Sequence, residues 1–240
     1  MEQNEYKNEN QNGCHSEGLD DCQAKLPTKL PTKRNTKRQT KNEVIFIGRS
    51  NVGKSTTLKL LTGRKVRVGK KPGVTRSPTN LEFDGLIVTD MPGFGYMANV
   101  TKENQEKIKE NIVHYVEDNA ERIICAVLVL DAKAFIEIVD RWEGRNEHPI
   151  DQEMFEFLYD VDIDVIVAVN KMDKIKKKEQ DAILDGIAER LGMLPPWRQW
   201  LDRIAPIAAK KGDVSALYAL ISDRLHKIGR DEWITHFKHG

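Results

Sequence analysis

The chain has 240 residues, of which 39% are hydrophobic and 31% charged, and its formal net charge at pH 7 is +1. This length allows one ordinary α/β domain plus an appendage, with enough residues to bury a sizeable core. No stretch reaches the ~18–20 apolar residues of a membrane span, and the N-terminus lacks the apolar core of a signal peptide. The sequence therefore predicts a soluble cytoplasmic protein, without a membrane partner.

Residues 1–42 are rich in polar residues and poor in aliphatic ones, so we expect a disordered tail there. Its first part, 1–24, has six acidic residues and one lysine, whereas 25–41 has seven Lys or Arg and no acid. Such a basic block either contacts RNA phosphates or merely keeps the tail solvated. Two of the three cysteines, Cys14 and Cys22, lie in this tail, and the spacing of all three gives no disulfide or metal framework.

The folded domain is expected over 43–240, where apolar strand-like runs alternate with helix-like segments. This alternation is typical of an α/β fold with a mostly parallel sheet and helices on both faces. Asp84-Gly85 is a hairpin signal, so one strand of the predicted six should run antiparallel. The expected strands are approximately 43–47, 80–84, 86–90, 122–130, 164–169 and 203–207. Apolar residues at helical spacing indicate core-facing helices at Ile108–Val116, Ile183–Leu191 and Val214–Ile228.

Residues 48–55 read GRSNVGKS, between the apolar run 44–47 and a helix-like segment. This is the Walker A phosphate loop of a P-loop NTPase in its required context, which makes a chance glycine-rich turn a weak alternative. Glycines let backbone N–H groups and a helix N-terminus point at phosphate oxygens. Lys54 is expected to reach the β- and γ-phosphates, and Ser55 to bind Mg²⁺. The expected phosphate-binding residues are Gly48, Arg49, Ser50, Asn51, Val52, Gly53, Lys54 and Ser55.

Three later segments indicate which nucleotide the phosphate loop binds. Asp90-Met91-Pro92-Gly93 follows a strand, so Asp90 can hold Mg²⁺ through water and the Gly93 N–H can meet the γ-phosphate. Asn170-Lys171-Met172-Asp173 follows another strand, where the carboxylate can accept two hydrogen bonds from guanine that adenine cannot donate. Asn170 is expected to meet the base, and the stem of Lys171 to pack along its plane. The alternative is a polar turn that only ends the strand. After the last strand, a backbone N–H of Ala208-Ala209-Lys210 can face guanine O6.

Two stretches fit the alternating pattern less well. Residues 135–150 are long and polar between a strand and the next helix. Residues 192–202 contain Trp197 and Trp200, for which packing of a short helix onto the sheet edge is favoured over a binding role.

With these motifs, the chain resembles the TRAFAC-class GTPases and, within them, the EngB (YihA or YsxC) family, in an archaeal form. The resemblance covers roughly 43–228 and rests on residues 48–55, Lys71-Pro72-Gly73-Val74-Thr75, the DMPGFGY run from Asp90, and His148–Asp151 leading to Met154. It implies that Thr75 is a switch ligand of Mg²⁺, with Gly73 and Val74 beside the nucleotide. Lys54, Thr75 and Gly93 would then serve catalysis. It also implies a role in large ribosomal subunit assembly, with a link to cell division and septation.

The residue after Gly93 is Phe94, which cannot orient a water molecule, so we expect slow intrinsic hydrolysis unless a partner helps. Asn51 either ligates K⁺ as a stand-in for an arginine finger or only shapes the loop. The leading hypothesis is a monomeric GTPase switch that binds GTP or GDP and a ribosomal subunit or rRNA. A GTP-dependent interaction module without hydrolysis is the alternative. A kinase-like group transfer is a third reading, disfavoured by the guanine-reading motif.

Overall fold

The structure is a computed structural model that describes residues 41–64, 77–95, 101–143 and 148–239. The tail up to residue 40 and the expected switch residues Gly73, Val74 and Thr75 lie outside these ranges. The first strand begins at Asn42, one residue before the expected domain boundary.

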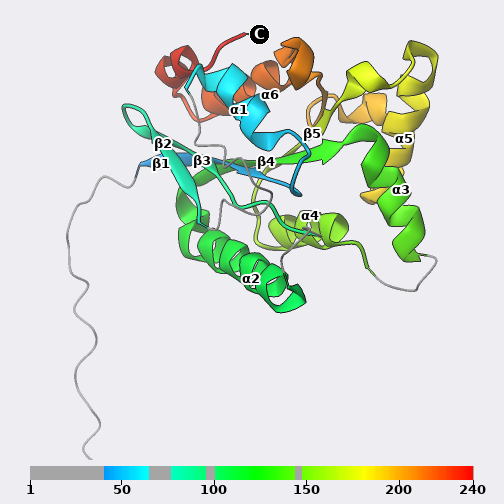
Figure 1. The fold of residues 1–240 in the computed structure, drawn as a ribbon. Helices are drawn as coiled ribbons and strands as arrows, with labels where there is room; N and C mark the ends of the chain where they lie inside the picture. The colour runs from blue at the N-terminus through cyan, green and yellow to red at the C-terminus, as the bar shows by residue number, and fades with distance from the viewer. Residues whose placement is uncertain (1–40, 65–76, 96–100, 144–147, 240) are drawn as a thin grey trace, which may run out of the picture. The chain divides into compact units, whose positions relative to one another are not determined.

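A six-stranded sheet forms the centre of the fold, with strand order β2-β3-β1-β4-β5-β6. Only β2 is antiparallel, to β3, and the other neighbours are parallel. Figure 1 shows the sheet between its helices. The expected mixed sheet is therefore confirmed, within two residues at nearly every boundary. The strands are β1 Asn42–Ile47, β2 Thr79–Glu82, β3 Leu86–Asp90, β4 Ile123–Asp131, β5 Val165–Asn170 and β6 Ile204–Pro206.

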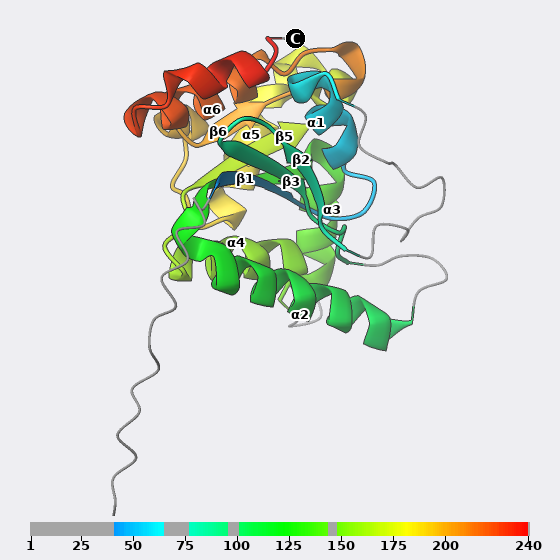
Figure 2. The same cartoon turned by 90° about the vertical axis from the view of Figure 1, so that its left-hand side faces the viewer.

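Helices cover both faces of the sheet because its central strands are apolar on both sides. In β1, Val44 and Phe46 join one buried cluster, and Ile45 and Ile47 join the other. Helices α1 and α6 pack against the first face, and α2 to α5 pack against the second. Figure 2 shows α2 and α4 on the side of the sheet opposite α1 and α6. The helices are α1 Lys54–Thr62, α2 Lys102–Asn119, α3 Ala132–Glu143, α4 Ile150–Asp160, α5 Gln180–Arg190 and α6 Ser215–Lys227.

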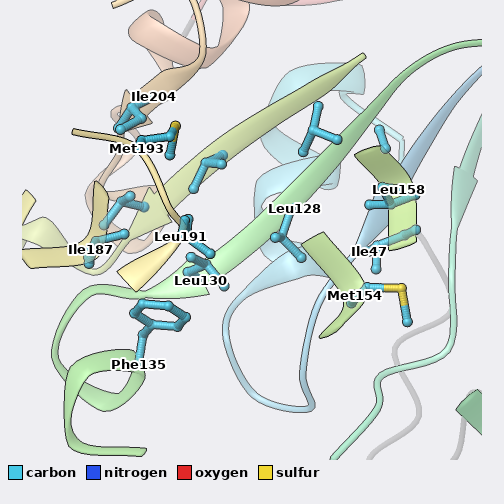
Figure 3. Packing of buried hydrophobic residues seen from close by; sticks show 14 of the residues in the cluster. Ile47, Leu128, Leu130, Phe135, Met154, Leu158, Ile187, Leu191, Met193 and Ile204 are labelled. Atoms are coloured by element: carbon cyan, nitrogen blue, oxygen red, sulfur yellow. The ribbon is translucent and has the colours of Figure 1, made fainter. Parts of the chain in front are cut away.

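Helix α3 is the main difference from the sequence expectation, which treated 135–150 as a long polar connection. Asp131 begins this helix by accepting hydrogen bonds from the Lys133 and Ala134 amides, both at 3.2 Å. Phe135 and Val139 then bury one face of the helix in the core. Figure 3 shows Phe135 close to Leu130 and the α5 residue Ile187. Ala132, Phe135, Ile136 and Val139 recur at helical spacing, so the signal was present in the sequence. It was missed because the segment was read together with the polar residues 143–148 that follow it.

Two smaller expectations concern the C-terminal half. Ile228 was expected on the core face of the last helix, but α6 ends at Lys227 and Ile228 is 46% exposed. Trp197 lies in a short 3₁₀ helix, is buried, and donates its ring N–H to Asp181 at 2.9 Å. Trp200 packs, partly buried, against the same core. The favoured packing role of the two tryptophans is confirmed.

Among the described helices, none is long and apolar enough to cross a membrane.

Candidate functional site

The phosphate loop connects β1 to α1 and is shaped by two glycines. Gly53 has a φ of 103°, and a Cβ atom there would lie 2.2 Å from Asn170 Nδ2. A Cβ atom on Gly48 would lie 2.4 Å from the carbonyl oxygen of Val129 in β4. Gly53 precedes α1, whose first turn has no side-chain cap. The loop therefore needs glycine at both positions, and the N–H groups of this helix terminus remain available for an anion.

Asp90 ends β3 beside this helix terminus and contacts two of the expected nucleotide-binding side chains. Its Oδ1 lies 2.9 Å from Lys54 Nζ, and its Oδ2 accepts a hydrogen bond from Ser55 Oγ at 2.7 Å. Asp90 is 1% exposed and Lys54 is 7% exposed. The carboxylate thus holds the lysine and the hydroxyl side by side at the carboxyl edge of the sheet, where open α/β sheets bind ligands.

The Ser55 hydroxyl and the Asp90 carboxylate form a chemically suitable site for a magnesium ion. Ser55 and Asp90 offer a hydroxyl and a carboxylate, the hard oxygen donors that Mg²⁺ prefers. Within the described residues, no group of three or more His, Cys, Asp or Glu side chains could hold a metal. An ion at Ser55 would take further ligands from phosphate and water.

Asn170 ends β5 and is 3% exposed, beneath the phosphate loop. Its Nδ2 donates to the Val52 carbonyl at 2.8 Å, and its Oδ1 accepts from the amides of Lys171 at 2.7 Å and Ala209 at 3.1 Å. Asn170 was expected to meet the base. In the structure its oxygen accepts hydrogen bonds from two backbone amides, so the side chain also braces three loops.

Lys171 has a left-handed backbone, with a φ of 66°, and its side chain returns to the phosphate loop. Its Nζ lies 2.8 Å from the Asn51 carbonyl oxygen and 2.5 Å from Asp131 Oδ2. The motif from Asn170 to Asp173 is thus attached to the phosphate loop through two of its side chains. Sequence reasoning missed Asp131, because only the fold brings it to within reach of Lys171.

Asp173 and Lys210 are exposed at the same edge of the sheet. Asp173 lies in the short turn Met172–Lys174, and no hydrogen bond or ion pair of its carboxylate occurs within the described ranges. Its acceptor atoms are therefore free for a ligand. The amides of Ala208 and Ala209 bond the Asp213 carbonyl and Asn170 Oδ1, so a base contact by Ala209 would have to replace or share the latter.

Four other expected binding residues, Val52, Met91, Pro92 and Met172, have buried side chains. Val52 and Met91 belong to the two core clusters on opposite faces of the sheet. These positions can meet a nucleotide only through their backbone atoms.

Phe94 is 1% exposed and lies in the core. Its carbonyl accepts a hydrogen bond from Ser50 N at 3.2 Å, and a Cβ atom on Gly93 would lie 2.8 Å from Ser50 Oγ. The Gly93-Phe94 backbone therefore packs against the phosphate loop while the ring points away from it. This orientation agrees with the expectation that Phe94 does not orient water.

Arg49 connects the phosphate loop to α4. Its guanidinium donates to Asp151 Oδ2 at 3.1 Å, and Asp151 is 1% exposed. Burial raises the pKa of Asp151, and the charge and hydrogen bond of Arg49 oppose that rise. A Cβ atom on Gly95 would lie 2.8 Å from the guanidinium carbon, so this pair also supports the segment that follows Asp90.

The sheet order, with the phosphate loop, the end of β3 at Asp90 and the loop Asn170–Asp173 meeting at one edge, is that of a P-loop nucleotide-binding fold. Comparison with known proteins agrees. A protein family described as "50S ribosome-binding GTPase" matches residues 43–171. A probable GTP-binding protein EngB of Methanosarcina mazei is 57% identical over 190 residues, covering 79% of this chain and 91% of that protein. Its counterpart in Methanopyrus kandleri is 50% identical over 201 residues, covering 82% and 98%.

A solved structure gives the same result: the crystal structure of a probable GTP-binding protein EngB aligns with a TM-score of 0.70 at 48% identity, covering 77% of this chain and 99% of that one. The chain belongs to the EngB family of GTP-binding proteins.

Proposed function

We propose that the protein is a Mg²⁺-dependent GTPase switch that hydrolyses GTP slowly and acts in assembly of the large ribosomal subunit. The observation that carries nucleotide binding is the attachment of the guanine-reading loop to the phosphate loop by Asn170 and Lys171. Because of it, the exposed Asp173 carboxylate and the Lys54–Asp90–Ser55 group belong to one braced site.

In this site each group has a defined task. The Asp173 carboxylate accepts two hydrogen bonds from guanine. Lys54 and the loop amides neutralise phosphate charge, and Ser55, with Thr75, supplies oxygen ligands for Mg²⁺, which neutralises further charge on the phosphates when bound. The Gly93 N–H meets the γ-phosphate. Asp90 contacts both Lys54 and Ser55 in the described structure, so it must give up these contacts when Lys54 turns to the phosphates and Ser55 to Mg²⁺.

The slow rate is inferred from Phe94, because its ring lies in the core and can neither donate nor accept the hydrogen bond that would orient water at the γ-phosphate. Unassisted switches of this kind turn over at about 10⁻³ s⁻¹ or less. The same observation favours a second candidate function, a GTP-dependent interaction module without significant hydrolysis. If Asn51 ligates K⁺, replacing Na⁺ by K⁺ raises the rate, and Asn51→Ala removes that response.

The ribosomal partner is supported by the description of the matching family, a 50S ribosome-binding GTPase. A role in cell division and septation, a cytoplasmic location and a monomeric state complete the proposal. Single-turnover hydrolysis of labelled GTP, with and without purified large subunits, tests it. Slow hydrolysis that the subunits accelerate supports a GTPase switch, and no hydrolysis under either condition supports the interaction module.

A further inference from the structure

Asp131, the last residue of β4, joins three parts of the protein. Its Oδ2 lies 2.5 Å from Lys171 Nζ, in the guanine-reading loop. Its Oδ1 accepts from the amides of Lys133 and Ala134, the first turn of α3. The side chain is 16% exposed. Burial opposes its charge, but the Lys171 ammonium and the α3 amides outweigh that effect and hold the pKa of Asp131 below its ordinary value.

The ammonium of Lys171 has two oxygen partners in the structure, Asp131 and the Asn51 carbonyl at 2.8 Å. Asn51 has a left-handed φ of 68°, so its carbonyl direction depends on an uncommon loop conformation. Without the carboxylate, Lys171 would keep one neutral acceptor and could rotate toward solvent, because its side chain is 25% exposed. The Asp131 carboxylate therefore fixes the position of the Lys171 ammonium. The ammonium in turn holds the Asn51 carbonyl.

Helix α3 completes this arrangement. Ala134, Phe135 and Ile138 line one side of a cavity of about 170 Å³, whose other side includes Arg49–Val52 of the phosphate loop and Lys171. Phe135 and Val139 bury the helix in the core, and Arg190 of α5 holds Asp140 near its far end at 2.5 Å. Asp131 thus lies between a firmly packed helix and the back of the phosphate loop.

We propose that Asp131 is a positioning residue that couples α3 to the nucleotide site by holding Lys171 against the phosphate loop. The inference rests on the proposed function, since it requires the nucleotide to be held between these two loops. It assigns Asp131 no contact with the nucleotide. Its effect is on how long a nucleotide stays bound.

The test separates the two tasks of Asp131. Asp131→Asn keeps an oxygen that can cap α3, because Asn is a good N-cap residue, but removes the charge that holds Lys171. Hydrogen bonds to charged groups are strong enough that labelled GDP should dissociate on the order of 10- to 100-fold faster. The thermal unfolding midpoint of the nucleotide-free protein should stay close to that of the wild type. Asp131→Ala should show the same faster release together with a lower midpoint.

A double-mutant cycle identifies the route of the effect. In a Lys171→Met background, Asp131→Asn should change GDP release by less than about twofold, because its partner is already absent. Glu137→Gln is the matched control: it removes an exposed carboxylate of α3 that does not contact Lys171, and it should leave release unchanged. Wild-type release rates for Asp131→Asn, or an equal acceleration with and without Lys171, would overturn the inference alone. A wild-type protein that retains no guanine nucleotide would overturn the proposed function and, with it, this inference.

Discussion

Single side chains at the carboxyl edge of the sheet set the chemistry of the site. Asp173 is exposed and has no partner within the described ranges, whereas Asn170 and Lys171 beside it are committed to the phosphate loop. In the proposed function, base recognition therefore rests on Asp173. Asn170 and Lys171 attach its loop to the phosphate loop, which the sequence alone did not indicate.

Asp173→Asn should reverse the base preference. The variant replaces one acceptor by a donor, so guanine loses a partner and xanthine, which carries a carbonyl in place of the guanine amine, gains one. We expect loss of GDP affinity by at least two orders of magnitude and a gain for xanthosine diphosphate, because buried polar groups without a partner are heavily penalised. Competition titrations against labelled GDP measure both. Unchanged GDP affinity would remove Asp173 from the base site.

Gly53→Ala should weaken nucleotide binding by about tenfold or more. The added methyl would meet Asn170 Nδ2 at 2.2 Å, on a backbone with a φ of 103°. Gly192→Ala is the matched control, since its φ is 72° and nothing lies within 4 Å of the added Cβ. It carries the backbone strain without the clash, so its GDP affinity should equal that of the wild type. Equal losses in both variants would show that the contact with Asn170 does not matter.

The contribution of an ion pair to the stability of the fold depends on how deeply the pair is buried. Arg49 and Asp151 join the phosphate loop to α4, with side chains 14% and 1% exposed. Lys107 and Glu103 form a pair on the surface of α2, with side chains 60% and 78% exposed. Removing one partner of a buried pair leaves an uncompensated charge, whereas exposed pairs contribute little.

Arg49→Ala should therefore lower the free energy of unfolding by about 2–3 kcal/mol, slightly less than for a fully buried pair because Arg49 retains some contact with water. Lys107→Ala should change it by no more than ~0.5 kcal/mol. Urea unfolding of the nucleotide-free variants gives both values. Adding Asp151→Asn to Arg49→Ala should recover part of the loss. If the two single variants were equally stable, the pair would not brace the loop.

At the level of elements, the sequence predicted the parts that rest on local pattern. The sheet and the phosphate loop follow from apolar periodicity and from a motif with its flanks. Helix α3 was missed although Phe135, Ile136 and Val139 have helical spacing, because the polar residues that follow them made the whole segment read as a connection. The contacts of Asn170, Lys171 and Asp131 join segments far apart in the chain, so no local pattern could reveal them. Asp151 was noted for family resemblance, but its partner Arg49 was not identified.

For the whole molecule, the first point is where the basic segment ends and the folded domain begins. Lys41 lies 2.6 Å from Glu82, and Asn42 already pairs with Leu86 in the sheet. A deletion should therefore end at residue 40 rather than 42. We expect the chain starting at Lys41 to keep its unfolding midpoint and GTP affinity.

The same deletion should weaken binding to ribosomal subunits, because the cations in 25–40 would contact RNA phosphates with a steep dependence on salt. Co-sedimentation of the full and shortened chains over a salt series measures this, with the largest difference at low salt. Equal binding at every salt concentration would mean that the segment only solvates the chain.

In the proposed function, the bound nucleotide controls how tightly the protein binds the large ribosomal subunit. The most direct test is co-sedimentation of the full chain with purified large subunits, in the presence of either a non-hydrolysable GTP analogue or GDP. A ligand shifts a conformational equilibrium only through its differential affinity for the two states, so a switch must show different subunit affinities with the two nucleotides. We predict at least tenfold tighter binding with the GTP analogue. Equal binding with both nucleotides, or no binding with either, would contradict the account.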